Sequence, residues 1–267
     1  SGCISHSKYR RSMKLATWNV NSLKVRLPQV LDFLAAQTPD VLCLQETKIE
    51  DDKFPFMEII AAGYQAICCG QKAYNGVAIL SRNQAADVVM GIDGYADPQK
   101  RVIVATVDGV RVICVYIPNG ENVESAKYKY KLDWLGRLNN CLKLELAKYS
   151  RLAILGDYNI APEDRDVHEP KLWEGKVLYT EPEKSAFKEQ VALGFCHSFR
   201  LFEQAEKSYS WWDYRTNGFK RGFGLRIDHI LLSAELSKRC KSCSIDRDRR
   251  AHDRPSDHAP VMVEIEI

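Results

Sequence analysis

The 267-residue sequence contains no apolar run long enough to cross a bilayer and no segment with the layout of a secretory signal peptide. Internal repeats, low-complexity tracts and Pro/Gly-rich linkers are also absent, so nothing in the chain marks a boundary between domains. The composition, 45% hydrophobic and 27% charged, is ordinary for a globular protein. These features exclude a helical membrane protein and a repeat architecture, and they predict one large domain with no membrane partner.

A cysteine framework is missing as well. The nine cysteines are odd in number, and several lie inside apolar runs such as VLCLQ (41–45) and RVICVY (111–116). A secreted disulfide scaffold would be shorter and more regularly spaced. Cys240 and Cys243 have the spacing of a metal knuckle, but no second pair completes four ligands. We therefore predict reduced thiols in a reducing compartment.

Two common catalytic signatures are absent, and the charge is nearly balanced. There is no Ser or Cys nucleophile elbow and no glycine-rich loop of the kind that cradles phosphates. The formal net charge is only +3, which is compatible with a polyanionic partner but does not identify one. Any chemistry in this chain must therefore come from other polar residues.

Strand-like apolar runs recur along the sequence, with helical patterns between them. Several runs are apolar throughout, which is typical of strands covered on both faces. We predict strands at 14–20, 41–45, 64–69, 76–81, 101–107, 111–117, 152–156, 225–233 and 260–267. We predict helices that begin at Pro28 and that span 125–148 and 184–193. This order indicates an α/β fold of two sheets packed face to face with helices outside.

The most informative pattern is a short polar cluster at the end of each of several apolar runs, where a scaffold holds side chains rigidly. Asn19 ends the first run, and its amide could reach a metal, a water or a phosphate oxygen, or could close a turn. Glu46 follows the second run, where a carboxylate is costly unless a cation such as Mg²⁺ pairs with it. Lys48 beside it could balance that charge or meet a phosphate.

Two further runs end in a phenol and in a carboxylate with an amide. Tyr116 could donate to a phosphate oxygen, although the Pro-Asn-Gly turn that contains Asn119 follows it. Asp157 and Asn159 are two residues apart in an extended chain and therefore point to the same face. That pair suits a proton-transfer group beside a donor that stabilises an oxyanion.

The last two clusters add an imidazole. Asp228 lies within the run at 225–233, and Asp257 and His258 precede the C-terminal run. Histidine is the usual proton carrier near neutral pH, and a carboxylate commonly orients it. Each cluster alone has a structural explanation, but six clusters that carry acid, amide, phenol and imidazole groups are hard to explain as structure. Together they indicate metal-assisted attack of water on a phosphodiester.

In these motifs the chain resembles the exonuclease III family of the endonuclease/exonuclease/phosphatase superfamily, over essentially 13–267. The order of LQETK, GDxN and a terminal SDH is highly specific, and SWWDYR and GLRID are similar to the DNA-repair branch. The matching segments are MKLATWNVNSLKVR, PDVLCLQETK, GQKAYNGVAILS, QKRVI, VYIPNG, LGDYNIAPEDRD, SWWDYR, GLRIDHILLS and PSDHAP. The resemblance implies a single domain with a four-layer α-β-β-α sandwich of two packed mixed sheets.

The resemblance also implies roles for the clustered residues. Glu46 would be the principal metal carboxylate, with Asn19 and Asp257 near the cation, which is expected to be Mg²⁺ or Mn²⁺. Asp157 would handle a proton at the reacting phosphate, as acid or as base. The groups expected to face the phosphate are Asn159, Tyr116 and the pair of Asp228 and His258.

A further set of residues is expected to contact DNA. Trp211 lies in a polar, turn-rich segment and could wedge against a baseless sugar or stack on a flanking base, although large aromatics are more often core. The others lie in loops that would approach DNA, where a solvated surface side chain is the alternative. They are Lys48, Lys72, Tyr74, Asn75, Lys100, Arg101, Asn119 and Arg215.

The stretch after the Asp157 cluster departs from the best-known members of the family. His168 lies there, near the expected path of the strand beyond the cut. It could bind a phosphate, or it could block that path and favour trimming at 3′ ends; a solvated loop histidine is the alternative. We hypothesise that His168 modulates the balance between internal incision and end trimming.

With the resemblance, these residues predict a metal-dependent DNA phosphodiesterase of base-excision repair. It would incise double-stranded DNA 5′ to abasic sites, remove 3′-blocking groups or digest from the 3′ end. One alternative keeps only the 3′-end activities, and another is a non-catalytic nucleic-acid-binding regulator on the same fold. We expect a monomer in the bacterial cytoplasm, associated with the nucleoid, rather than in a eukaryotic nucleus.

The first twelve residues, 1–12, are polar and basic and precede the first hydrophobic element at Met13. Ser1 and Gly2 resemble the remnant of an expression tag or upstream read-through. We therefore predict that residues 1–12 are a disordered basic tail or an added segment, outside a domain of residues 13–267. A basic arm that touches nucleic acid is the alternative.

Overall fold

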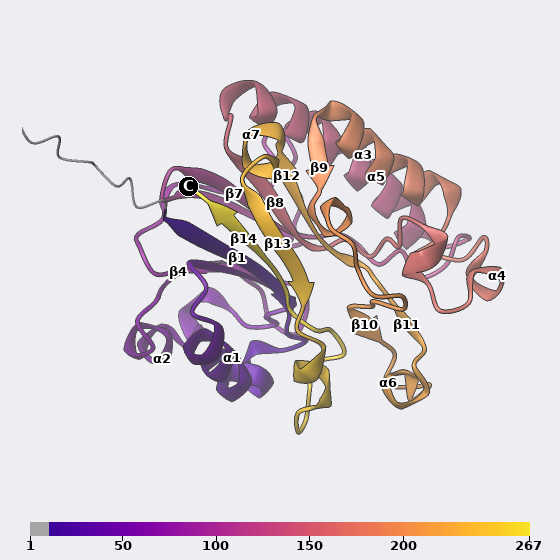
Figure 1. The fold of residues 1–267 in the computed structure, drawn as a ribbon, viewed down its shortest axis with the longest axis horizontal. Coiled ribbons are helices and arrows are strands. Elements are labelled where there is room, and N and C mark those ends of the chain that lie inside the picture. The colour runs from indigo at the N-terminus through magenta and orange to yellow at the C-terminus, as the bar shows by residue number, and fades with distance from the viewer. Residues whose placement is uncertain (1–10) are drawn as a thin grey trace, which may run out of the picture.

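Two mixed six-stranded sheets form the centre of the computed structural model, which describes residues 11–267 (Figure 1). The first sheet has the order β13 (Cys240–Ile245), β14 (Val261–Glu266), β1 (Ser12–Asn19), β2 (Val41–Gln45), β4 (Val77–Ser81) and β3 (Gln65–Cys69). The second has the order β5 (Ala86–Met90), β6 (Val102–Val107), β7 (Val110–Tyr116), β8 (Leu152–Asp157), β12 (Asp228–Ser233) and β9 (Phe195–His197). One parallel pair lies inside each sheet, β1–β2 and β7–β8, and the other neighbours are antiparallel.

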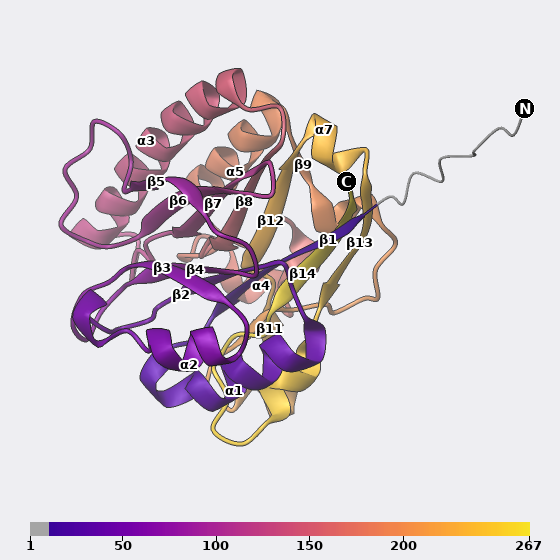
Figure 2. The same cartoon turned by 90° about the vertical axis from the view of Figure 1, so that its left-hand side faces the viewer.

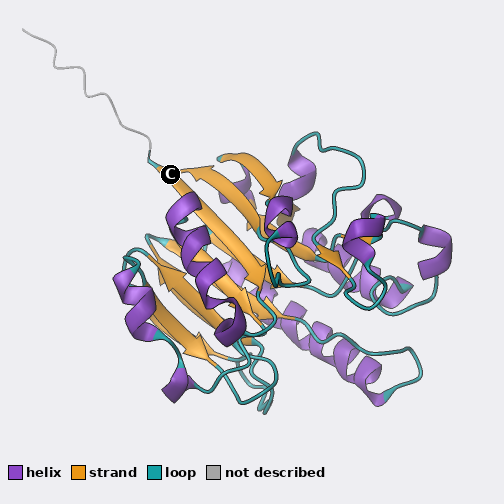
Figure 3. Cartoon of the chain, turned by 90° about the horizontal axis from the view of Figure 1, so that it is seen from below, coloured by secondary structure: helices purple, strands orange, loops and turns teal. Residues whose placement is uncertain are grey.

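Helices cover the outer face of each sheet and complete four layers (Figures 2 and 3). α1 (Leu23–Gln37) and α2 (Phe56–Ala61) lie on the first sheet, and α3 (Ala126–Lys148) and α5 (Glu181–Leu193) lie on the second. The predicted single-domain α-β-β-α sandwich is confirmed. Shorter elements are α4 (Pro170–Trp173), α6 (Gly218–Arg221), α7 (Ala234–Ser237), and the strands β10 (Trp211–Trp212) and β11 (Gly224–Leu225).

The main core lies between the two sheets. Leu15 and Val41 from the first sheet meet Val112 and Leu155 from the second, and all four are fully buried. Cysteines such as Cys114 take part in the same core. Every cysteine within residues 11–267 is free, which agrees with the prediction of reduced thiols.

Three details of the predicted elements were wrong. The first helix begins at Leu23 rather than at Pro28, because Ser22 caps it by accepting a hydrogen bond from Val25 N at 3.3 Å. Pro28 lies inside the helix, where a proline removes one backbone hydrogen bond. The run at 225–233 is split into β11 and β12, and β5, β9 and β13 were not predicted at all. Each of these three missed strands lies at an edge of its sheet.

The first strand, β1, begins at Ser12, one residue before Met13. Arg11 N donates to Ile267 O at 3.2 Å, and Ser12 pairs in register with Glu266 in β14. Residues 1–10, most of the predicted tail, lie outside the described residues, so the tail stays a prediction. Within residues 11–267, no helix is both long and apolar enough to cross a membrane.

Candidate active site

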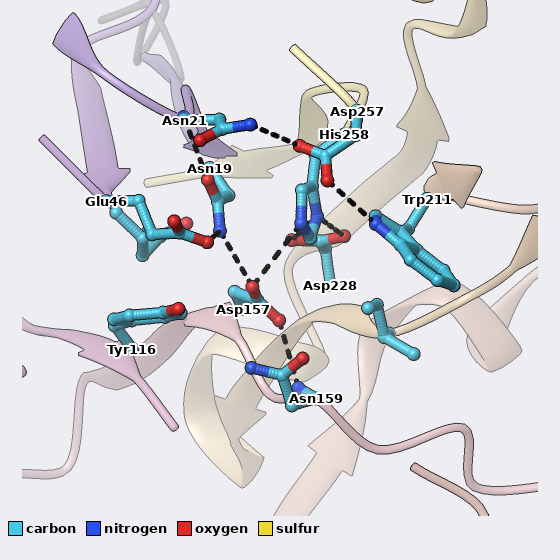
Figure 4. A network of polar contacts seen from close by, with 12 residues as sticks. Asn19, Asn21, Glu46, Tyr116, Asp157, Asn159, Trp211, Asp228, Asp257 and His258 are labelled. Atoms are coloured by element: carbon cyan, nitrogen blue, oxygen red, sulfur yellow. Dashed lines mark hydrogen bonds and ion pairs between the residues drawn. The ribbon is translucent and has the colours of Figure 1, made fainter. Parts of the chain in front are cut away.

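The directions of the strands bring the predicted clusters to one end of the sandwich. The carboxyl ends of the parallel strands β1 and β2 lie together in the first sheet, and those of β7 and β8 lie together in the second. Asn19 at the end of β1 bonds Asp157 at the end of β8, so all four carboxyl ends lie at one end of the sandwich. β14 runs antiparallel to β1, and β12 runs antiparallel to β8, so their amino ends arrive there too. In this register Asp157 lies opposite both Tyr116 and Asp228. The side chains from these strand ends therefore converge (Figure 4).

Asn19 joins two of the carboxylates. Its Nδ2 donates to Glu46 Oε1 and to Asp157 Oδ2, both at 2.8 Å. Its Oδ1 accepts a hydrogen bond from the backbone N of Asn21 at 3.0 Å. Since Asn19 is fully buried, these bonds fix the spacing of the two carboxylates.

His258 lies between two aspartates. Its Nδ1 is 2.8 Å from Asp228 Oδ2, and its Nε2 is 3.5 Å from Asp157 Oδ2. Burial lowers the pKa of His258, but the charges of Asp228 and Asp157 outweigh that effect and raise the pKa to about 10. The imidazole is therefore a cation at neutral pH, held in place by Asp228 (Figure 4).

Asp157 is the most perturbed carboxyl group of the site. Burial raises its pKa, and the neighbouring charges of Asp228 and Glu46 raise it further, while His258 and Asn19 lower it; the result is about 7. A carboxyl group with this pKa can both accept and donate a proton near neutral pH.

A divalent cation fits one group of these residues. Glu46, Asp157 and His258 offer ligand atoms that all lie within 4.8 Å of one another. Carboxylate oxygens suit a hard cation such as Mg²⁺ or Mn²⁺. A cation would also offset the negative charges of Asp228 and Glu46, which contribute to the raised pKa of Asp157. The residues present therefore fit a divalent metal.

Asn19 and Asp257, predicted to lie near the cation, are not in this group, and their place beside a metal stays a prediction. Asp257 points its carboxylate at other partners, since Oδ1 accepts from Asn21 Nδ2 at 3.3 Å and Oδ2 accepts from Trp211 Nε1 at 3.0 Å (Figure 4). Lys48 donates to Asn21 Oδ1 at 2.7 Å and lies 3.4 Å from Glu46 Oε2, so it balances charge at the site.

A groove of about 920 Å³ opens beside this cluster. Tyr116 and Asp257 line it, together with most of the residues predicted to contact DNA: Tyr74, Asn75, Arg101, Asn119, Trp211 and Arg215. Lys72 and Lys100 are exposed and do not line this groove. The structure thus gathers loops that are far apart in the sequence around one concave surface.

Two groove residues also have structural partners. The guanidinium of Arg101 lies 4.7 Å from the centre of the Tyr116 ring and donates to Tyr116 O at 3.1 Å, so Arg101 supports that phenol. Trp211 is partly exposed in the groove and pairs through its backbone with His258, whereas Trp212 is buried against Phe219. Only the first of the two tryptophans is therefore available to a ligand.

His168 is not a freely solvated loop histidine. Its ring stacks on Phe223, with centroids 4.7 Å apart and planes at 11°, and its Nδ1 lies 3.1 Å from Gly224 O. It is outside the group of residues around Asp157 and does not line the groove. A role for His168 stays a prediction.

Comparison with known proteins identifies the family. Residues 16–258 match the Endonuclease/Exonuclease/phosphatase family. The chain belongs to this family. It is 36% identical over 265 residues to an exodeoxyribonuclease III of Haemophilus influenzae, a match that covers 94% of this chain and 99% of that protein.

Two solved structures of this family are similar over nearly the whole chain. A 3′ phosphatase from Neisseria, NExo, bound to a product DNA hairpin, is 46% identical with a TM-score of 0.94. An AP endonuclease from Archaeoglobus fulgidus is 39% identical with a TM-score of 0.92. Each match covers 96% of this chain and 100% of the other. The resemblance to the exonuclease III family is confirmed.

Two residues of this site were given no role from the sequence. Asn21 links Lys48 to Asp257, and its position two residues after Asn19 was a usable signal. Lys131 lies in α3 and donates to the carbonyl groups of Asn119 and Asn159. Its spacing of four and seven residues from Leu135 and Leu138 places it on the buried face of the helix, which was also a usable signal.

Proposed function

We propose that this protein is a divalent-metal-dependent DNA phosphodiesterase of base-excision repair that acts at abasic sites and at 3′ ends. The observation that carries the proposal is Asp157, a buried carboxyl group with a pKa of about 7, bonded to Asn19 and 3.5 Å from His258. The relatives named as exodeoxyribonuclease III, 3′ phosphatase and AP endonuclease support DNA as the substrate.

The side chains divide the chemistry among them. Asp157 exchanges a proton at the reacting phosphate, and charged His258 attracts its oxygens. Burial, and then Glu46 and Asp157, raise the pKa of the Tyr116 phenol well above its usual value, so Tyr116 keeps its proton and donates it in a hydrogen bond. One N–H of the Asn159 amide binds Ile117 O at 2.8 Å, which leaves the other for a phosphate oxygen.

Glu46 is proposed as the principal ligand of the cation, with Asn19 beside it, whereas Asp157 and the charged His258 act on the phosphate. When bound, a divalent cation supplies an activated water and neutralises charge on the phosphate. Mg²⁺ is proposed, with Mn²⁺ as a substitute, because the carboxylate donors are hard.

Duplex DNA is proposed to lie in the groove beside the site. Trp211 would meet the baseless sugar or a flanking base, and Arg215 and Asn75 would meet the backbone. Every side chain invoked comes from one chain, so a monomer suffices. We propose that it works in the bacterial cytoplasm, at the chromosomal DNA.

Two end-labelled duplexes test the proposal. One carries an internal abasic-site analogue and the other ends in a 3′-phosphate, and each is incubated with Mg²⁺, with EDTA or with an Asp157→Asn variant. We expect metal-dependent cleavage that the variant loses. If neither duplex changes although the protein binds both, the enzyme is excluded and a non-catalytic DNA-binding regulator takes its place.

A second candidate, an enzyme restricted to 3′ ends, is favoured by one observation. The His168 ring is locked by Phe223 and Gly224 O, so it is rigid enough to obstruct a continuous strand rather than to move aside. The similarity to a 3′ phosphatase points the same way. In the duplex assay, this candidate predicts release of the terminal phosphate without internal incision.

In this candidate, replacing His168 by glycine is expected to raise the ratio of abasic incision to 3′-phosphate release on the order of 10-fold. The reason is that the ring would no longer obstruct the DNA strand beyond the cut. Both rates are measured on the two duplexes under single-turnover conditions. His252→Gly, at an exposed loop histidine, is the matched control and should leave the ratio unchanged. An unchanged ratio in His168→Gly would show that this residue does not control the balance.

A further inference from the structure

Lys131 lies in the interior of the protein, unlike the two lysines that precede it in its helix. α3 begins at Ala126, and Lys127 and Lys129 in its first turns are exposed. Lys131 has no exposed surface. A buried ammonium group is costly unless each of its three protons has an acceptor. Its partners therefore indicate why the charge is placed there.

Three acceptors surround the Lys131 ammonium. Nζ donates to Asn159 O at 2.6 Å and to Asn119 O at 3.1 Å, and it forms an ion pair with Glu183. Gly120 packs against the lysine stem, since a Cβ added there would lie 3.1 Å from Lys131 Cδ. The lysine thus ties together the two loops that follow β7 and β8.

Glu183 is itself held rigidly, which anchors the ammonium. It is the third residue of α5, and Thr180 N and Thr180 Oγ1 donate to its Oε1 at 3.1 and 2.7 Å. Leu178 N donates to its Oε2 at 3.1 Å. This capping box needs a glutamate or glutamine but no partner cation. The ion pair with Lys131 is therefore an addition to the cap.

The two carbonyl groups that bind Lys131 belong to residues of the site. Asn119 lines the groove, and Asn159 N donates to Asp157 Oδ1 at 2.9 Å. Asn159 has a φ of 50°, a left-handed conformation that asparagine adopts more readily than most residues other than glycine. With this backbone, the N–H of Asn159 binds Asp157 while its carbonyl binds Lys131.

We propose that Lys131 is a positioning residue for hydrolysis: its ammonium, anchored by Glu183, holds the carbonyl groups of Asn119 and Asn159, so that Asn159 orients Asp157. The proposal rests on the proposed function and extends it to a charge that does not reach the substrate. Lys131 acts through Asn159, and its removal lowers the rate of the chemical step rather than the affinity for DNA.

If Lys131 had only a structural role, its removal would lower the melting temperature but not kcat. A second buried cation provides the comparison. Arg111 lies in β7 near the far end of α3, where its Nε is 3.7 Å from Glu145 and its guanidinium is 5.0 Å from the Tyr149 ring centre. Removing either cation should lower the melting temperature. Only removal of Lys131 should lower kcat.

The test uses Lys131→Met and the double variant Lys131→Met/Glu183→Gln, which leaves no unpaired charge and keeps a capping-box residue. Arg111→Met is the matched control. For each protein we measure thermal unfolding, and kcat and KM on the 3′-phosphate and abasic duplexes with Mg²⁺. The double variant and Arg111→Met are also combined with Asp157→Asn, which removes the carboxyl group that Asn159 N orients.

The double variant is expected to fold, to keep its KM and to lose about 100-fold in kcat, as for a small misplacement of reacting groups. In the Asp157→Asn background the same change should add little, because residues that act as a unit are not additive. Arg111→Met should keep its kcat in both backgrounds.

Three results would overturn the inference: an unchanged kcat in the double variant, an equal loss of kcat in the Asp157→Asn background, or an equal loss in Arg111→Met. If the unaltered protein hydrolyses neither duplex, the proposed function fails and this inference fails with it. If the unaltered protein is active and the double variant is as active, only the inference fails.

Discussion

Asp157→Asn is expected to lower kcat by about 10²- to 10⁴-fold, the usual contribution of a positioned acid or base. The amide has the size of the carboxyl group, but its nitrogen cannot accept, so one of the two hydrogen bonds from Asn19 Nδ2 and Asn159 N is lost. The amide also cannot exchange a proton near neutral pH, which the carboxyl group can do because its pKa is about 7. The loss therefore falls on the chemical step.

Single-turnover cleavage of the two duplexes measures this effect, and duplex affinity is measured separately in EDTA. Asp52→Asn is the matched control, because Asp52 is exposed, does not line the groove, and the change removes the same charge. We expect the control to cleave normally. Cleavage by Asp157→Asn within a few-fold of the unaltered protein would mean that another group transfers the proton.

Asp166→Asn is expected to lower the free energy of unfolding by about 3–5 kcal/mol, the usual cost of removing one partner from a buried ion pair. Asp166 is fully buried, and its Oδ1 accepts from Arg226 Nε at 2.8 Å and from Arg200 at 2.6 Å. Arg226 is 1% exposed and also lies 3.0 Å from the rings of His197 and His229. Without the carboxylate, this buried guanidinium has no anion to compensate its charge.

Urea unfolding followed by circular dichroism measures the change. Asp164→Asn, at an exposed aspartate two residues earlier in the same loop, is the control and should cost less than about 1 kcal/mol. Equal destabilisation by the two variants would mean that the loop, and not the buried ion pair, determines the loss.

The sequence was most informative where residues follow strands. Glu46, Tyr116 and Asp157 were predicted as one site because each ends an apolar run, and the directions of the strands do bring them together. The buried strands of both sheets were found for the same reason, since burial on both faces leaves a continuous apolar pattern. The outer strand β5 was missed because all its residues are exposed and carry no such pattern.

Contacts that depend on three-dimensional packing could not be predicted in this way. Lys131 lies on the buried face of α3, in step with Leu135 and Leu138, but only the approach of α5 and two loops gives it three acceptors. The carboxylate of Asp257 binds Trp211 in a neighbouring hairpin, and its place near the cation stays a prediction. Both sets of contacts depend on partners distant in the sequence, for which no local pattern exists.

The central claim is that the acidic cluster around Asp157 hydrolyses DNA with a divalent cation held by Glu46. The most direct test is single-turnover cleavage of the 3′-phosphate and abasic duplexes over a titration from EDTA to excess Mg²⁺, for the unaltered protein and for Glu46→Gln. We predict no cleavage in EDTA, a saturable rise with Mg²⁺, and a midpoint at least about 10-fold higher in Glu46→Gln, as expected when a ligand charge is lost. Cleavage that persists in EDTA, or the same Mg²⁺ midpoint for both proteins, would contradict the account.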